Sequence, residues 1–150
     1  WNARHLLNAA LPEPAPGRET SHVTGAGVLL LEPDRRIWVL LLANPACAAR
    51  VGFPNATKHP ELSLQATAIR ETWLRMGLRA RPVAWLGDLD TEAGGIRYYL
   101  AERTGGSPQG RQPDQAEPYL TSLDRLTLLN GRFPGFLAHA ETLTWLQRSL

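Results

Sequence analysis

One segment of the chain places charged side chains at a spacing that could do chemistry. Residues 53–78 read FPNATKHPELSLQATAIRETWLRMGL, a tight loop followed by an uninterrupted stretch at 63–77 that predicts a helix. Glu71 and Arg75 are four positions apart, so they share one face of that helix with Leu74. A carboxylate there could hold a divalent cation, and a guanidinium could bind a phosphate. The segment therefore has the layout of a phosphate and metal site.

This segment resembles the signature box of the Nudix superfamily. In that family a glycine is followed by five residues and a glutamate, and seven residues later by Arg-Glu-U-x-Glu-Glu-x-Gly-U, where U is a bulky apolar residue. The stretch RETWLRMGL keeps Arg70, Glu71, Gly77 and Leu78 of this pattern. The resemblance extends from about residue 23 to the end of the chain, and it implies an α/β/α sandwich.

The segment departs from the box at the positions that carry its acids. Leu74 and Arg75 stand where the family has paired glutamates. Before the helix, Ala56 stands at the leading glycine, and Leu62 stands at the leading glutamate with Glu61 beside it. The helix face that would carry three carboxylates carries only one, and its charge changes from −3 to 0.

The resemblance implies both a cofactor and a reaction. In the family the glutamates hold Mg²⁺ or Mn²⁺ against the pyrophosphate of a nucleoside diphosphate linked to another group, and water cleaves the anhydride. Carried onto this chain, Glu71 becomes the catalytic and metal-binding residue, with Glu61 as a second metal ligand. Arg75 works against such a site, because two unit charges 4 Å apart interact by roughly 4 kcal/mol at an effective dielectric of 20, and a divalent ion doubles that.

Two roles for Arg75 stay open at this point. It could bind a phosphate of the ligand directly, as Arg70 could, because a planar guanidinium suits that geometry. The domain would then hold a diphosphate without activating water. Alternatively, Arg75 and Glu71 form a surface ion pair worth about 0.3–0.5 kcal/mol.

Apolar residues nearly surround the same helix. Leu64, Leu74 and Leu78 add apolar surface on the side where acids are expected. Because a helix that is apolar all round tends to be buried, we expect a loop, the N-terminal arm or a second subunit to cover this side. A homodimer that buries this face is therefore one hypothesis.

Other residues that could take part are given structural interpretations. Acids stand at the ends of the predicted strands, among them Asp88 and Glu102, and we interpret them as turn residues or solvated charges. The aromatic residues Trp85, Tyr98 and Tyr99 could stack a nucleobase, but residues of this type on strands usually pack.

The rest of the chain predicts the elements around the segment. We expect an N-terminal helix and proline-rich arm over residues 1–20, then a single domain over 21–150. In that domain the pattern predicts strands at 22–32, 37–43, 81–90, 96–103 and 116–122, a loop at 44–52, and helices at 63–77, 123–130 and 133–150. Because this order is mixed and not alternating, it predicts an α+β fold with a mixed sheet.

Composition excludes several classes of protein. The net charge is +2 and the 16 basic residues are scattered, so there is no basic stripe for nucleic acid. No apolar run approaches the roughly 20 residues that a membrane helix needs. Cys47 is the only cysteine, which excludes an internal disulfide and fits a reducing compartment. Since the N-terminus also lacks the layout of a signal peptide, we expect a cytoplasmic protein.

Three functional hypotheses follow from these residues. The first is a Nudix domain with lost or weak pyrophosphohydrolase activity that binds a nucleotide-like ligand or a protein. The second is a working Nudix hydrolase that uses Glu71 and non-standard metal ligands. The third is an assembly module that buries its apolar helix face in a dimer.

Overall fold

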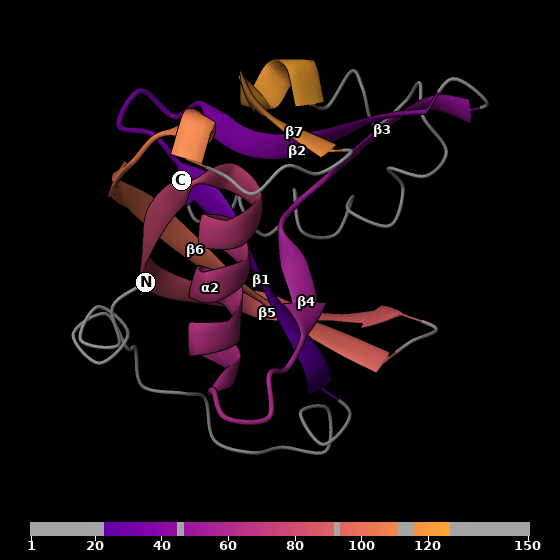
Figure 1. The fold of residues 1–150 in the computed structure, drawn as a ribbon, viewed down its shortest axis with the longest axis vertical. Helices are drawn as coiled ribbons and strands as arrows, with labels where there is room; N and C mark the ends of the chain where they lie inside the picture. The colour runs from indigo at the N-terminus through magenta and orange to yellow at the C-terminus, as the bar shows by residue number, and fades with distance from the viewer. Residues whose placement is uncertain (1–22, 45–46, 92–93, 111–115, 127–150) are drawn as a thin grey trace.

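The computed structural model describes residues 23–44, 47–91, 94–110 and 116–126 (Figure 1). Its helices and strands are, in chain order, β1 (Val23–Leu31), β2 (Ile37–Asn44), β3 (Cys47–Gly52), β4 (Asn55–Thr57), α2 (Leu64–Met76), β5 (Leu78–Thr91), β6 (Gly94–Gly106), the 3-10 turn η2 (Pro108–Gly110) and β7 (Ala116–Thr121). The predicted N-terminal helix and arm, the predicted boundary at residue 20 and the predicted helix at 133–150 lie outside the described residues.

The strands of the described residues form one mixed sheet. Its order is β3-β2-β1-β6-β5, with β4 paired to β1 and β7 paired to β2. The central strands β1 and β6 run parallel, with Leu29 opposite Leu100 and Leu30 opposite Ala101. Every other strand pairing among the described residues is antiparallel. The predicted α+β class with a mixed sheet is therefore confirmed.

The five strands predicted from the sequence are present. β1 and β2 form a hairpin, with Leu31 opposite Ile37, and the Glu32 N–H donates to the Arg36 carbonyl across the turn at 2.8 Å. The predicted strands at 81–90 and 96–103 lie within the longer β5 and β6, and the strand predicted at 116–122 corresponds to β7.

The loop predicted at 44–52 is wrong, because residues 47–52 form β3. This strand pairs antiparallel with β2, with Leu40 opposite Gly52 and Leu41 opposite Val51. Its sequence, CAARVG, has only one β-branched residue and ends in glycine, so its own strand preference is weak. The strand forms because N–H and C=O groups along β2 supply its hydrogen-bond partners, and the sequence of the segment alone does not reveal that pairing.

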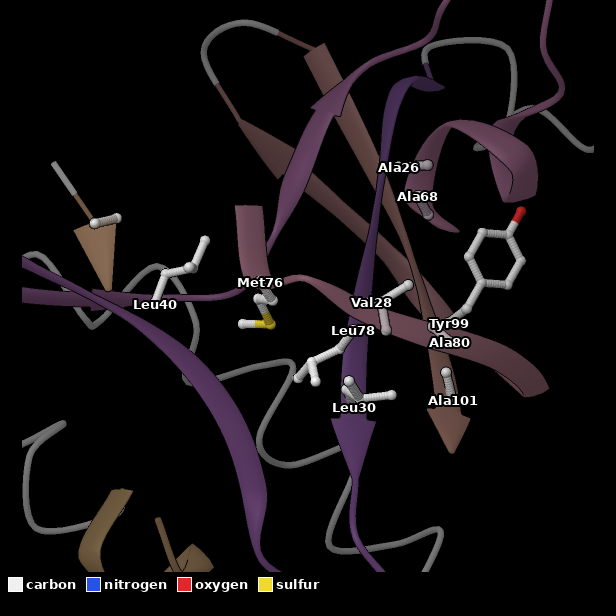
Figure 2. Packing of buried hydrophobic residues seen from close by; sticks show 11 residues of the cluster. Ala26, Val28, Leu30, Leu40, Ala68, Met76, Leu78, Ala80, Tyr99 and Ala101 are labelled. Atoms are coloured by element: carbon white, nitrogen blue, oxygen red, sulfur yellow. The ribbon is translucent and has the colours of Figure 1, made fainter. Parts of the chain in front are cut away.

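Two apolar clusters lie on opposite faces of the sheet. The cluster on the α2 side is here called the helix-side core, and Figure 2 shows how its side chains gather around Val28 and Leu30; it contains Ala26, Val28, Leu30, Leu40, Ala68, Met76, Leu78, Ala80, Tyr99, Ala101 and Ala116. The other cluster is called the opposite core and contains Leu29, Ile37, Val39, Phe53, Leu89, Tyr98 and Leu126. Successive residues of β1 alternate between the two clusters, because side chains of a strand point to alternate faces.

Helix α2 begins and ends as the sequence predicts. Ser63 is the N-cap, and its Oγ accepts from the Ala66 N–H at 3.1 Å. Gly77 ends the helix with a φ of 71°, a conformation that glycine adopts without a steric penalty, and its N–H donates to the Trp73 carbonyl at 2.8 Å. The helix therefore holds residues 64–76 in a fixed rotation relative to the sheet.

A short helical segment lies on the other face of the sheet. Residues 123–126 are helical, and the Ser122 Oγ accepts from the Arg125 N–H at 3.2 Å, as an N-cap side chain does. Leu126 is fully buried in the opposite core, and Leu123 packs against it. Helical residues thus cover both faces of the sheet, as an α/β/α sandwich requires.

Candidate functional site

Glycines in β1 hold the loop before α2 close to the sheet. Strand β4 pairs with β1, with Gly25 opposite Thr57 and Gly27 opposite Asn55. A Cβ on Gly27 would lie 2.7 Å from the Pro54 carbonyl oxygen and 2.6 Å from the Tyr98 ring. The two glycines therefore serve this close approach of backbone to backbone.

Side-chain and backbone hydrogen bonds join the same loop to α2. The His59 N–H donates to the Thr67 hydroxyl at 3.0 Å, which joins the loop to the first turn of α2. The His59 Nδ1 accepts from the Glu61 N–H at 3.1 Å, and the Lys58 N–H donates to the Thr24 carbonyl at 2.8 Å. The loop is thus fixed to both β1 and α2.

Glu71 and Arg75 form an ion pair on the helix. The Arg75 Nε lies 3.8 Å from the Glu71 Oε1, at the i,i+4 spacing. The Arg75 side chain is 31% exposed and the Glu71 side chain is 19% exposed, so the pair is partly covered but can be reached from solvent. Of the two roles left open for Arg75, the structure shows the ion pair with Glu71.

The other candidate residues lie around this pair. Arg70 and Leu74 are half-buried on α2. Glu61 is exposed in the turn before the helix. The helix places Glu71 beside Arg75 and Leu74, and its first turn carries no acid.

Two solved structures are similar to this fold. A Nudix hydrolase from Nitrosomonas europaea superposes with a TM-score of 0.62 at 12% identity, over 81% of this chain and 87% of that chain. A structure described as an ADP compounds hydrolase superposes with a TM-score of 0.67 at 17% identity, over 84% of this chain and 71% of that one. The chain has a Nudix-like fold. No protein-family model matches its sequence, and no curated protein matches it either.

The metal that the Nudix resemblance implies can be tested against the residues present. Among the described residues, no three His, Cys, Asp or Glu side chains are grouped so that they could hold a metal ion. The Glu71 carboxylate forms an ion pair with the Arg75 guanidinium, and the apolar side chain of Leu74 is its neighbour on the helix. Mg²⁺ and Mn²⁺ prefer several oxygen ligands, so the described part of this helix face does not fit them.

The apolar face assigned to dimerisation is largely covered by the chain itself. Leu78 is 1% exposed in the helix-side core, and Leu64 packs against that core. Leu78 begins β5 and packs in the helix-side core (Figure 2), so the sheet and helix of the chain itself cover this residue. Leu74 remains half-buried on α2.

One cluster of polar residues was missed by the sequence interpretation. Asp88, expected as a turn residue or solvated charge, instead lies opposite Arg97 in the β5–β6 pair. The Arg97 Nε and Nη2 donate to the Asp88 Oδ1 and Oδ2 at 2.8 and 3.2 Å, with side-chain exposures of 5% and 10% for Arg97 and Asp88. Trp85 adds a weaker 3.4 Å contact to Asp88, and its ring lies 5.9 Å from the Arg97 guanidinium carbon. Opposite charges at facing positions of a predicted hairpin are the signal that could have found this pair.

The strand aromatics divide between core and surface. Tyr98 and Tyr99 are buried, as their interpretation as packing residues predicts, whereas Trp85 is 45% exposed. Burial raises the pKa of the Tyr98 hydroxyl, which receives a 3.3 Å hydrogen bond from the Asn55 side-chain amide. Tyr98 thus acts as part of the packing between the loop and the sheet.

No helix in the described part of the chain is long and apolar enough to cross a membrane.

Proposed function

We propose that this chain is a Nudix-like domain with lost or weak metal-dependent pyrophosphohydrolase activity, which binds a nucleotide-like diphosphate. The observation that carries the proposal is the ion pair between Glu71 and Arg75 on α2. The pair places the Arg75 guanidinium on the helix face where a metal-dependent hydrolase of this fold would need several carboxylates. A divalent ion bound beside Arg75 would be repelled by it.

Arg75 and Arg70 supply the anion-binding groups in this proposal. The Arg75 guanidinium is 3.8 Å from its carboxylate partner, longer than a strong charge-assisted hydrogen bond, so it can exchange that partner for a phosphate oxygen. Arg70 lies half-buried on the same helix. One structural neighbour is described as an ADP compounds hydrolase, which makes ADP the first probe to use.

The test compares hydrolysis with binding in the same set of variants. Wild-type protein is incubated with a panel of nucleoside diphosphate derivatives and Mg²⁺ or Mn²⁺, and ADP binding is measured by calorimetry with a chelator present. We expect little or no hydrolysis, metal-independent ADP binding, and about ten-fold weaker binding in Arg75→Ala. Arg36→Ala is the matched control, because Arg36 forms an exposed ion pair with Asp34 in the β1–β2 turn.

A double variant that restores the family's acids sharpens the test. Leu74→Glu combined with Arg75→Glu returns two carboxylates to the face that carries Glu71. If the fold has kept the rest of the machinery, this variant gains metal-dependent hydrolysis that the wild type lacks. Efficient hydrolysis by the wild type, abolished by Glu71→Gln, would overturn the inactive assignment and favour the active alternative.

The active alternative has one observation in its favour. The Glu71 side chain retains 19% exposure, so its carboxylate can be reached from solvent. In this alternative Glu61 or another acid completes the ligand set. A manganese titration followed by paramagnetic broadening at Glu71 distinguishes it from the inactive domain.

The homodimer is the remaining alternative, and the part-exposed Leu74 is what the structure leaves to support it. Sedimentation of a monomer at high concentration would count against it. A shift from dimer to monomer in Leu74→Glu would support it.

A further inference from the structure

A cavity lies at the turn between β1 and β2, away from α2. Its volume is about 470 Å³, within the range of small-molecule sites. The end of β1, the turn after it, the middle of β5 and the second half of β6 line it, and no residue of α2 is among the lining residues described. The Nudix-type helix face and this cavity are therefore separate sites.

The floor of the cavity is apolar. Leu31 and Leu100 line it and also pack against the opposite core. Val83 adds an isopropyl group that is 43% exposed, one of the largest apolar exposures among the described residues. It lies where the β5–β6 register shifts between Pro82 and Ala84. An apolar group of a ligand would cover surface here that otherwise faces water.

The rim of the cavity carries four charged side chains, the carboxylates of Glu32 and Glu102 and the guanidinium groups of Arg35 and Arg103. Glu32 accepts from the Arg103 Nε at 2.5 Å and from the Trp38 Nε1 at 2.8 Å, so its carboxylate is already engaged. Glu102 is paired with Arg81, which lies outside the lining. Arg35 is the cation of the lining whose guanidinium has no ion-pair partner within the part of the chain that the structure describes.

The backbone of Arg35 is strained. Its φ is 70°, in the left-handed region, and it is the one non-glycine residue with positive φ among those described. Hairpin turns normally place glycine or asparagine at such a position, because a Cβ there is sterically unfavourable. The Arg35 N–H donates to the Glu32 carbonyl at 2.9 Å, which fixes this conformation. Strain of this kind that persists beside a cavity points to a use for the side chain.

We propose that this cavity binds a small molecule with an apolar body and one anionic group, a carboxylate or a phosphate. Arg35 binds the anion, since a guanidinium suits either group and that of Arg35 has no ion-pair partner among the described residues. Leu31, Val83 and Leu100 contact the apolar body. Ligand binding here does not depend on the activity of the α2 face.

The test uses three eight-carbon probes that differ in the head group: octanoate, octyl phosphate and octanol. Each is titrated into the full chain while methyl NMR signals of Leu31, Val83 and Leu100 are followed. We expect both anions to shift these signals and octanol to bind about ten-fold more weakly or worse. The tighter of the two anions identifies the head group. Equal affinity for octanol and octanoate, or no shift with either anion, would overturn the proposal.

Variants separate ligand binding from folding. Arg35→Gly removes the guanidinium and relieves the backbone strain, so anion affinity should fall about ten-fold while the Tm stays equal or rises. Val83→Glu places a carboxylate on an exposed position of the lining, and it should also weaken anion binding. The control is Arg36→Ala, in the same turn but outside the lining. Unchanged octanoate affinity in Arg35→Gly would contradict the proposal.

Discussion

Two carboxylate–guanidinium ion pairs in this molecule differ in burial and in hydrogen-bond geometry. Asp88 and Arg97 meet through two hydrogen bonds of 2.8 and 3.2 Å and are nearly buried. Glu71 and Arg75 are joined by one contact of 3.8 Å and remain partly exposed. Desolvated, bidentate charges depend on each other, whereas an exposed pair contributes little to stability. The difference indicates that the Asp88–Arg97 pair contributes more to the stability of the fold than the pair on α2 does.

The largest expected effect comes from breaking the buried pair. Asp88→Ala leaves the Arg97 guanidinium buried without its carboxylate, so we expect a loss of about 3–5 kcal/mol in the free energy of unfolding. Urea denaturation measures it. Asp90→Ala is the matched control, since Asp90 is exposed on the same strand and should change stability by less than about 0.5 kcal/mol. Equal losses of stability in Asp88→Ala and Asp90→Ala would mean that the buried pair contributes no more to stability than an exposed acid does.

The pair between Glu32 and Arg103 is intermediate in exposure, and the pH dependence of stability tests its contribution. The hydrogen bond from Arg103 lowers the pKa of Glu32 below its usual 4.5, more than partial burial raises it. A lowered folded-state pKa contributes stability above the unfolded pKa, and that contribution is lost as the pH falls through the folded value. Glu32→Gln should therefore cost about 1 kcal/mol at neutral pH and a smaller amount below pH 4.5. Thermal unfolding of both proteins between pH 7 and about pH 3 measures this; parallel curves would contradict it.

The smallest expected effect comes from the pair on α2. Glu71→Ala should lower the free energy of unfolding by no more than about 0.5 kcal/mol, and added salt should reduce the difference, because exposed charges are screened. A double-mutant cycle with Arg75→Ala isolates the pair. A coupling of several kcal/mol would mean that the pair is structural and would argue against its exchange for a phosphate.

Local signals account for the parts of the fold that the sequence predicted. Ser63 and Gly77 mark the ends of α2 by their capping chemistry, and both ends are confirmed. The i,i+4 spacing of Glu71 and Arg75 also left an ion pair open as one of two roles for Arg75, and the structure contains that pair. Each of these features depends on residues within about one or two helical turns, which is the range that a sequence pattern conveys.

Features that depend on distant partners were not predicted. Strand β3 forms because β2 offers it a partner, and Leu78 is buried because β5 starts against the helix-side core. Asp88 is buried because Arg97 faces it from another strand. The left-handed conformation of Arg35 depends on the hairpin turn around it. Mg²⁺ or Mn²⁺ binding, the nucleotide-like ligand, the homodimer and the cytoplasmic location stay predictions.

The parallel pairing at the centre of the sheet sets the order in which the domain can assemble. Leu29 meets Leu100, a residue 71 positions later, so β1 and β6 close a loop that contains β2, β3, β4, α2 and β5. Closing a loop of this length costs chain entropy before its contacts form, and non-local topology of this kind slows folding. The β5–β6 hairpin and α2 are local and can form early, whereas the middle of the sheet is completed only when the two ends of this loop meet. Amide exchange in β1 should therefore become protected later in refolding than exchange in the β5–β6 hairpin.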